Sequence, residues 1–95
     1  MTYIRLSVVK PHPGFEQRAL ELLEALSAAT ANSPGWQANY VLRPHDDSGE
    51  VARISIYDDE SSAEREAATP SVLSLRSQLL LIIEPGHRER AFFSV

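Results

Sequence analysis

Two periodicities alternate along this chain, and their order restricts the fold more than any other feature. Apolar residues recur at every second position in 2–9 and again in 51–57, as in β-strands that present two different faces. After the first of these segments, the spacing changes to the three- and four-residue intervals of an amphipathic helix. This helical stripe consists of Phe15, Ala19, Leu22, Leu26 and Ala29. We therefore expect strands and helices to alternate within one small domain.

Residues that favour turns separate these elements. The segment 11–14 interrupts the first strand, and 32–35 ends the first helix before a second strand at 36–43. The segment 45–50 is rich in aspartate, serine and glycine, which tolerate the backbone of a tight reversal. The strands at 36–43 and 51–57 are thus predicted to form a hairpin.

The second helical region is predicted to be broken in two. Ser61 and Glu64 have the spacing of a capping box, and Thr69 followed by Pro70 indicates a second helix start. The longer half has an apolar stripe that is nearly a full circle, which predicts packing on both of its sides. Its members are Val72, Leu75, Leu79, Leu80, Leu81, Ile82 and Ile83.

A fourth strand is expected at 90–95, after Pro85 and Gly86. The order β, α, β, β, α, β is that of the ferredoxin-like α+β fold, a four-stranded antiparallel sheet with the helices on one face. The chain is predicted to form a single domain, 1–95. We expect the helix-free face to meet a second copy, and we assign to it Tyr3, Arg5, Ser7, Arg53, Ser55 and Tyr57.

Composition narrows the range of functions. The formal net charge is -4 and no cluster of lysine or arginine is present, so neither nucleic acid nor a membrane is an expected partner. The chain contains no cysteine, which excludes thiolate nucleophiles and cysteine-ligated metals. Residues 1–10 alternate like a strand instead of resembling a signal peptide, and the longest apolar run, 79–83, is too short to span a bilayer. The expected location is cytoplasmic.

Several segments together resemble a known family. They are the loop Lys10-Pro11-His12-Pro13-Gly14, the turn Ser33-Pro34-Gly35-Trp36, and Arg53-Ile54-Ser55-Ile56-Tyr57 followed by an acidic helix start. In this arrangement the chain resembles the antibiotic biosynthesis monooxygenase-like domains of the dimeric α/β-barrel superfamily. The resemblance implies a homodimer with a pocket between sheet and helices in each subunit. Some members oxidise phenols or quinols with dioxygen and no cofactor, and others degrade haem.

The chain departs from that pattern at two places. Tyr57 stands where many members have a tryptophan, and Ala63, Ala67 and Ala68 occupy the region that supplies an iron-binding histidine in the haem-degrading members. Haem degradation is therefore not expected, and we expect neither a cofactor nor a metal.

Candidate site residues are few. Trp36, Tyr40 and Tyr57 offer aromatic walls for a flat ligand, and the Asn39 amide is a donor suited to stabilising an oxyanion. Strand alternation places Asn39 opposite Trp36 and Tyr40, so a shared pocket requires a bulge. The alternative role for Trp36 and Tyr57 is to pack in the core or in an interface.

Charged and ionisable candidates also have two interpretations. Arg5 and Arg53 share one predicted sheet face, where they would pair with an acidic ligand or connect the two subunits of a dimer. His12, His45 and His87 lie in predicted loops without metal-ligand spacing, and of these His12 is retained as a candidate for substrate binding.

Two functions remain open. The first is a cofactor-independent monooxygenase acting on a small aromatic or quinone-type molecule, with Asn39, Trp36 and Tyr57 as candidate catalytic residues and Tyr40, Arg53 and His12 as candidate substrate contacts. The second is a non-catalytic homodimer that binds a small ligand or serves in a stress response. The monooxygenase requires a cavity with a hydrogen-bond donor directed into it.

Overall fold

Seven elements follow one another in a computed structural model that describes residues 1–95. They are β1 (Tyr3–Val9), α1 (Glu16–Thr30), β2 (Trp36–Leu42), β3 (Val51–Tyr57), α2 (Glu60–Ala67), α3 (Pro70–Leu80) and β4 (Arg88–Phe93). All four predicted strands and the division of the second helical region are confirmed. The largest shift is at β4, which begins at Arg88 and ends at Phe93. None of the three helices has the length and apolar content needed to cross a membrane.

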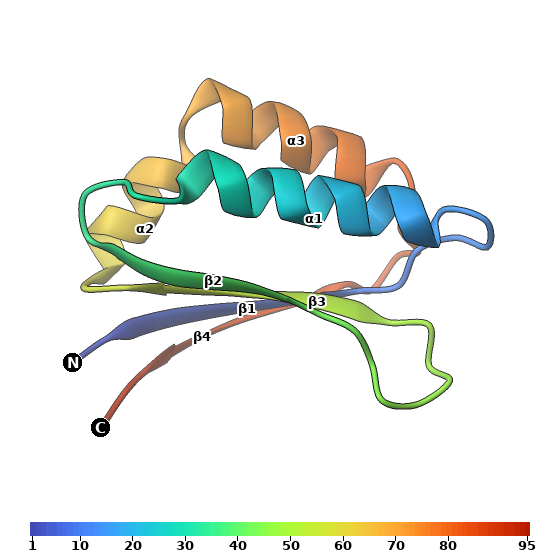
Figure 1. Ribbon diagram of the computed structural model, residues 1–95, viewed down its shortest axis with the longest axis horizontal. Helices are drawn as coiled ribbons and strands as arrows, with labels where there is room; N and C mark the ends of the chain where they lie inside the picture. Colours follow the sequence, from blue (N-terminus) through green and yellow to red (C-terminus); the bar gives the residue numbers. More distant parts are fainter.

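The strands form one antiparallel sheet in the order β2-β3-β1-β4. The three helices lie on the same face of this sheet, and α1 runs along it between the sheet and α3 (Figure 1). The ferredoxin-like fold predicted from the order of elements is therefore confirmed.

The helices cover the face that the sequence analysis assigned to the partner subunit. Arg5 pairs with Ser55 and Ser7 with Arg53 across β1 and β3, so these four side chains share one face. The Arg53 guanidinium donates hydrogen bonds to the side chains of Ser27 and Thr30 in α1. The predicted assignment of faces is thus wrong. Strand alternation separates two faces but does not identify which one the helices will cover.

The opposite face of the sheet is free of helices and largely apolar. Register places the following side chains on it: Ile4, Leu6, Val8, Ala38, Tyr40, Leu42, Ala52, Ile54, Ile56 and Phe92. Several of the large ones are exposed, including Tyr40 at 55% and Phe92 at 43%. We call this surface the open face.

The helix-covered face is apolar at its two ends and polar between them. At one end, Val9 and Val51 pack with leucines of α1 and α3 in a cluster of nine buried residues. At the other end, Tyr3 and Tyr57 pack with Ala63 and with the partly buried Trp36. The polar residues of β1 and β3 lie between these clusters.

The predicted helix stripes are only partly correct. Phe15 and Ala29 are exposed, whereas Leu23 and Thr30 of α1 are buried instead. Beyond α3, Ile83 is buried but Leu81 is 81% exposed, so the second side of that segment has no packing partner within the chain.

The start of α2 differs from the predicted capping box. Asp59 is the N-cap, and its carboxylate accepts a hydrogen bond of 2.8 Å from the Ser62 backbone N–H. At α3, Thr69 is the N-cap and Pro70 occupies the first turn, as predicted. The hydrogen bond from the Ser62 N–H, with help from the Ser61 hydroxyl, holds the pKa of Asp59 below its ordinary value.

We expect Asp59→Ala to lower the melting temperature at neutral pH, because α2 loses its cap. A carboxyl whose pKa is lowered in the folded state stabilises the fold above its unfolded pKa of about 3.9, and this contribution disappears as pH falls through the lowered value. The difference in melting temperature between the two proteins should therefore shrink below about pH 4. Asp47→Ala, in the exposed β2–β3 turn, is the control. A difference that stays constant down to pH 2.5 would contradict this assignment.

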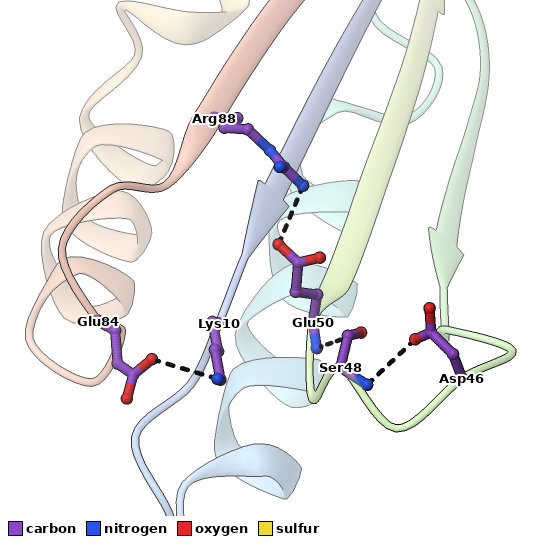
Figure 2. Close-up of polar contacts among 6 residues, drawn as sticks. All are labelled: Lys10, Asp46, Ser48, Glu50, Glu84 and Arg88. Carbon is purple, nitrogen blue, oxygen red and sulfur yellow. Dashed lines mark hydrogen bonds and ion pairs between the residues drawn. The ribbon is translucent and has the colours of Figure 1, made fainter.

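Ion pairs connect the elements at one end of the sheet (Figure 2). Lys10 lies 3.8 Å from Glu84, and Arg88 lies 3.0 Å from Glu50, connecting β4 to the start of β3. In the adjacent turn, backbone N–H groups of Glu50 and Ser48 donate to the side chains of Ser48 and Asp46. Exposed pairs of this kind contribute about 0–1 kcal/mol each, so they align the ends of the strands more than they stabilise the domain.

Candidate functional site

A cavity of about 340 Å³ lies between the sheet and the helices. It forms because α1 packs on β2 and β3, while α3 packs mainly on α1 and makes few contacts with the sheet. Four apolar side chains of α1 and α3 form its upper wall: Leu23, Leu26, Val72 and Leu79. The volume is at the lower end of the range of about 300–1,000 Å³ for small-molecule sites.

The floor of the cavity is polar. Arg5 and Ser7 of β1 and Arg53 and Ser55 of β3 all line it. Arg5 lies directly opposite Ser55, and Ser7 lies directly opposite Arg53. The two arginines are therefore diagonal neighbours on the same face of the sheet. Hydroxyl and guanidinium donors therefore face an apolar wall, which is the arrangement that orients a small ligand.

Arg53 is held by three neutral groups. Its Nε donates to Ser27 Oγ at 3.0 Å, and its Nη2 donates to Thr30 Oγ1 at 3.1 Å and to Asn39 Oδ1 at 3.3 Å. Burial lowers the pKa of the guanidinium, while nearby Tyr57 acts against this shift and the charge of Arg76 acts with it. Arginine nevertheless stays protonated in proteins, so the group presents a permanent cation to the cavity.

Asn39 lies on the helix-covered face, opposite Ser55, and a bulge brings Trp36 to the same face. The register of β2 against β3 shifts between Trp36 and Ala38, which places Trp36 on the same side as Asn39. The Asn39 amide nitrogen donates to the Ser27 carbonyl at 2.9 Å and to Thr30 Oγ1 at 3.1 Å, while its oxygen accepts from Arg53. Asn39 therefore connects β2 to α1 and positions Arg53.

Trp36 and Tyr57 lie beside the cavity in the aromatic cluster at its end. They pack with Tyr3, whose hydroxyl accepts a hydrogen bond of 3.2 Å from Arg5 Nε. The buried Trp36 Nε1 has no hydrogen-bond partner within the protein. The cluster thus borders Arg5, but Trp36 and Tyr57 are not among the residues that line the cavity.

Two candidate residues lie elsewhere. Tyr40 projects from the open face, on the opposite side of the sheet from the cavity, as strand alternation predicted. His12 lies in the loop after β1, where its backbone N–H donates to the Ile82 carbonyl, and it does not line the cavity. The structure therefore brings Arg53 to the cavity, places Asn39 behind it, and leaves Tyr40 and His12 apart from both.

Sequence reasoning missed Arg76 and Glu89. Arg76 of α3 lines the cavity and forms an ion pair of 3.0 Å with Glu89 of β4, another lining residue. The sequence contains one signal for Arg76. This residue lies four positions after Val72 and three before Leu79, so it interrupts the apolar stripe of the helix. A charge inside such a stripe indicates a polar environment on the buried side of a helix.

Comparison with known proteins gives one matching family and many similar folds. A protein-family model described as antibiotic biosynthesis monooxygenase matches residues 2–76. A search of curated protein sequences finds no significant match.

Solved structures with the same fold include Rv0793 from Mycobacterium tuberculosis, with a TM-score of 0.90, 16% identity, and coverage of 100% of this chain and 96% of that one. SnoaB, a cofactor-independent oxygenase from Streptomyces nogalater, has a TM-score of 0.86 and 18% identity, with coverage of 99% and 93%. A conserved protein from Methanosarcina mazei Go1 has a TM-score of 0.89 and 12% identity, with coverage of 97% and 91%. At these identities the likeness shows the fold alone.

Proposed function

Because this chain belongs to the antibiotic biosynthesis monooxygenase family, we propose that its cavity is the active site of a cofactor-independent oxygenase for a small aromatic or quinol-type molecule. The observation that supports this most strongly is the cavity itself, which has an apolar wall on the helix side and guanidinium and hydroxyl donors on the sheet side. The similar fold of SnoaB, a cofactor-independent oxygenase, is consistent with it.

The chemistry requires an electron-rich substrate. When an anthrone-type phenol loses a proton, the resulting anion can pass electrons to dioxygen, so that a ring CH₂ group and O₂ become a C=O group and water. The protein then has to bind the flat ring, exclude water and stabilise negative charge on the substrate oxygen. In this proposal Arg53 stabilises that charge, the leucine wall holds the ring, and Asn39 acts by positioning Arg53.

Oxygen consumption provides the test. We expect the purified protein to consume dioxygen with at least one member of a panel of hydroquinones and anthrone-type phenols. Asn39→Ala should lower kcat by up to about 100-fold, because Arg53 loses an anchor and shifts away from the reacting oxygen. Trp36→Ala tests whether the aromatic cluster supports the site.

The matched control is Gln37→Ala. Gln37 lies in the same strand but is exposed, and it bonds to Asp58 away from the cavity. Oxygen uptake no greater than the blank across the whole panel would reject the oxygenase.

A non-catalytic ligand-binding domain is the second candidate, and one observation favours it. Both groups of the Asn39 amide are engaged by α1 and Arg53, so the amide is not free to bind a substrate. Trp36 and Tyr57 also lie outside the cavity lining. Ligand binding without oxygen uptake is the result that this candidate requires.

We further propose that the open face forms the interface of a homodimer. Its apolar residues are central in the sheet, no helix covers them, and large side chains such as Tyr40 and Phe92 are exposed. An exposed apolar surface formed by a whole sheet face is typical of an interface. The partner would therefore pack on the side of the sheet opposite the cavity.

A further inference from the structure

The charge of Arg53 has no acidic counterpart in the protein. The five ion pairs of the structure do not include Arg53, and all three groups that it bonds are neutral. Removing a charge from water is costly unless an opposite charge compensates it. These three hydrogen bonds use Nε and Nη2, and Arg53 lines the cavity, so the guanidinium N–H groups that they leave unused can serve a ligand there.

The other charges around the cavity reinforce that of Arg53. On the cavity side of the sheet and helices are three arginines, Arg5, Arg53 and Arg76, and one acid, Glu89. Glu89 pairs with Arg76 at 3.0 Å, while the only acid near Arg5 is Glu64, at 3.9 Å and largely exposed. Arg90 also borders the cavity, but its guanidinium stacks on Phe92 of the open face. The side chains around the cavity therefore carry a net positive charge, although the net charge of the whole chain is -4.

The dimensions and the wall of the cavity define the rest of the ligand. About 340 Å³ accommodates one or two fused rings more readily than a large polycyclic compound. Leucine and valine side chains on the helix side offer an apolar surface to a flat ring, and the cations lie on the sheet side. A ligand that uses both surfaces has an aromatic body and a negatively charged group at one edge.

We propose that the cavity binds an aromatic carboxylate of one or two rings, with the carboxylate bound by Arg53 and assisted by Arg5. This inference deepens the proposed function, because it rests on the same cavity and specifies which aromatic molecules enter it. A planar guanidinium is well suited to a carboxylate, since its N–H groups match the carboxylate oxygens in geometry and charge.

Calorimetric titration with two matched compounds tests the proposal. The probes are 1-hydroxy-2-naphthoate and 1-naphthol, which share the ring and the hydroxyl and differ in the carboxylate. We expect the wild-type protein to bind the naphthoate about 10- to 100-fold more tightly than the naphthol, the range expected for one charge-assisted hydrogen-bonded contact. Equal affinities, or a preference for naphthol, would overturn the proposal.

Substitutions then identify the cation responsible. Arg53→Met keeps a side chain of similar length and removes the charge, so naphthoate affinity should fall by a larger factor than naphthol affinity and the preference for naphthoate should disappear. Arg53→Lys keeps the charge without the planar group and should retain part of the preference. Arg18→Met is the control, because Arg18 is an exposed residue of α1 that bonds Gln78 away from the cavity. A preference that survives in Arg53→Met overturns the assignment to Arg53.

A second variant and a comparison of binding with oxygen uptake complete the test. If circular dichroism shows that Arg53→Met does not fold, Arg5→Met replaces it, and a loss of at least about threefold in naphthoate affinity is then expected. No change in Arg5→Met would also count against the proposal. Binding is measured without dioxygen turnover, so naphthoate binding with no oxygen uptake rejects only the oxygenase. Oxygen uptake with neutral quinols and no carboxylate preference rejects only this inference.

Discussion

Replacing Gly35 with alanine is expected to lower the free energy of unfolding by about 2–5 kcal/mol. Gly35 precedes β2 and has a φ of +84°, a conformation that costs a residue with a Cβ about 1–2 kcal/mol. A Cβ built there would also overlap the buried Ser62 of α2, lying 2.6 Å from Ser62 Cβ and in contact with Ser62 Oγ. Such overpacking costs about 1–3 kcal/mol in addition.

The consequence reaches the aromatic cluster. The Gly35 carbonyl accepts a hydrogen bond of 2.7 Å from the Asp58 N–H, so the start of β2 and the end of β3 are joined where Trp36 and Tyr57 pack. If the added methyl group pushed α2 away from these strand ends, the packing of Trp36 and Tyr57 would be disturbed. With a shift of about 4–8 °C per kcal/mol, the melting temperature should fall by at least about 8 °C.

Gly86→Ala isolates the contribution of the contact with Ser62. Gly86 has a φ of +92°, yet a Cβ there would meet no atom within 4 Å, so only the conformational cost of about 1–2 kcal/mol applies. Thermal and urea unfolding of the two variants should therefore differ by the overpacking term. Equal destabilisation in both would show that Ser62 moves aside without cost.

The second large effect is expected at the open face, where Ile54→Glu should convert a dimer into a folded monomer. Ile54 lies near the centre of this face, between Leu6 of β1 and Tyr40 of β2. In a two-fold interface the substitution occurs twice, and each unpaired buried charge costs about 3 kcal/mol. The combined cost of about 6 kcal/mol weakens the dimer by more than about 10⁴-fold.

Light scattering coupled to size-exclusion chromatography measures this change directly. Leu73→Glu is the matched control, because Leu73 is an exposed leucine on α3, on the helix side of the domain. The open face is excluded as the interface if Ile54→Glu remains a dimer or if the wild-type protein is a monomer at micromolar concentration. Dissociation by Leu73→Glu instead would place the interface on the exposed leucines of α3 and the segment that follows it.

The candidate site shows where sequence reasoning reached its limit. The sequence indicates Arg53 because it shares a predicted sheet face with Arg5 and can pair with an acidic ligand, and it indicates Asn39 because its amide suits an oxyanion. Their actual relationship depends on Ser27 and Thr30, which lie in α1 and contact Arg53 across 26 and 23 residues of sequence. The bulge between Trp36 and Ala38, which has no marker such as glycine in the sequence, also decides which side chains share a face.

The strands, the helices and their order could be predicted from the residues alone. Period-two alternation, the Pro-Gly turns and the Thr69-Pro70 helix start are local properties, so contiguous residues are sufficient to specify them. Long-range packing, in contrast, is what places the helices over the face with Arg5 and Arg53 and leaves the face with Ile54 and Leu6 open. Alternation shows that a strand has two different faces, but it does not indicate which of them a helix will cover. The choice between them depends on packing and hydrogen bonds to a helix distant in sequence, and the cavity exists only where α3 packs on α1 and not on the sheet.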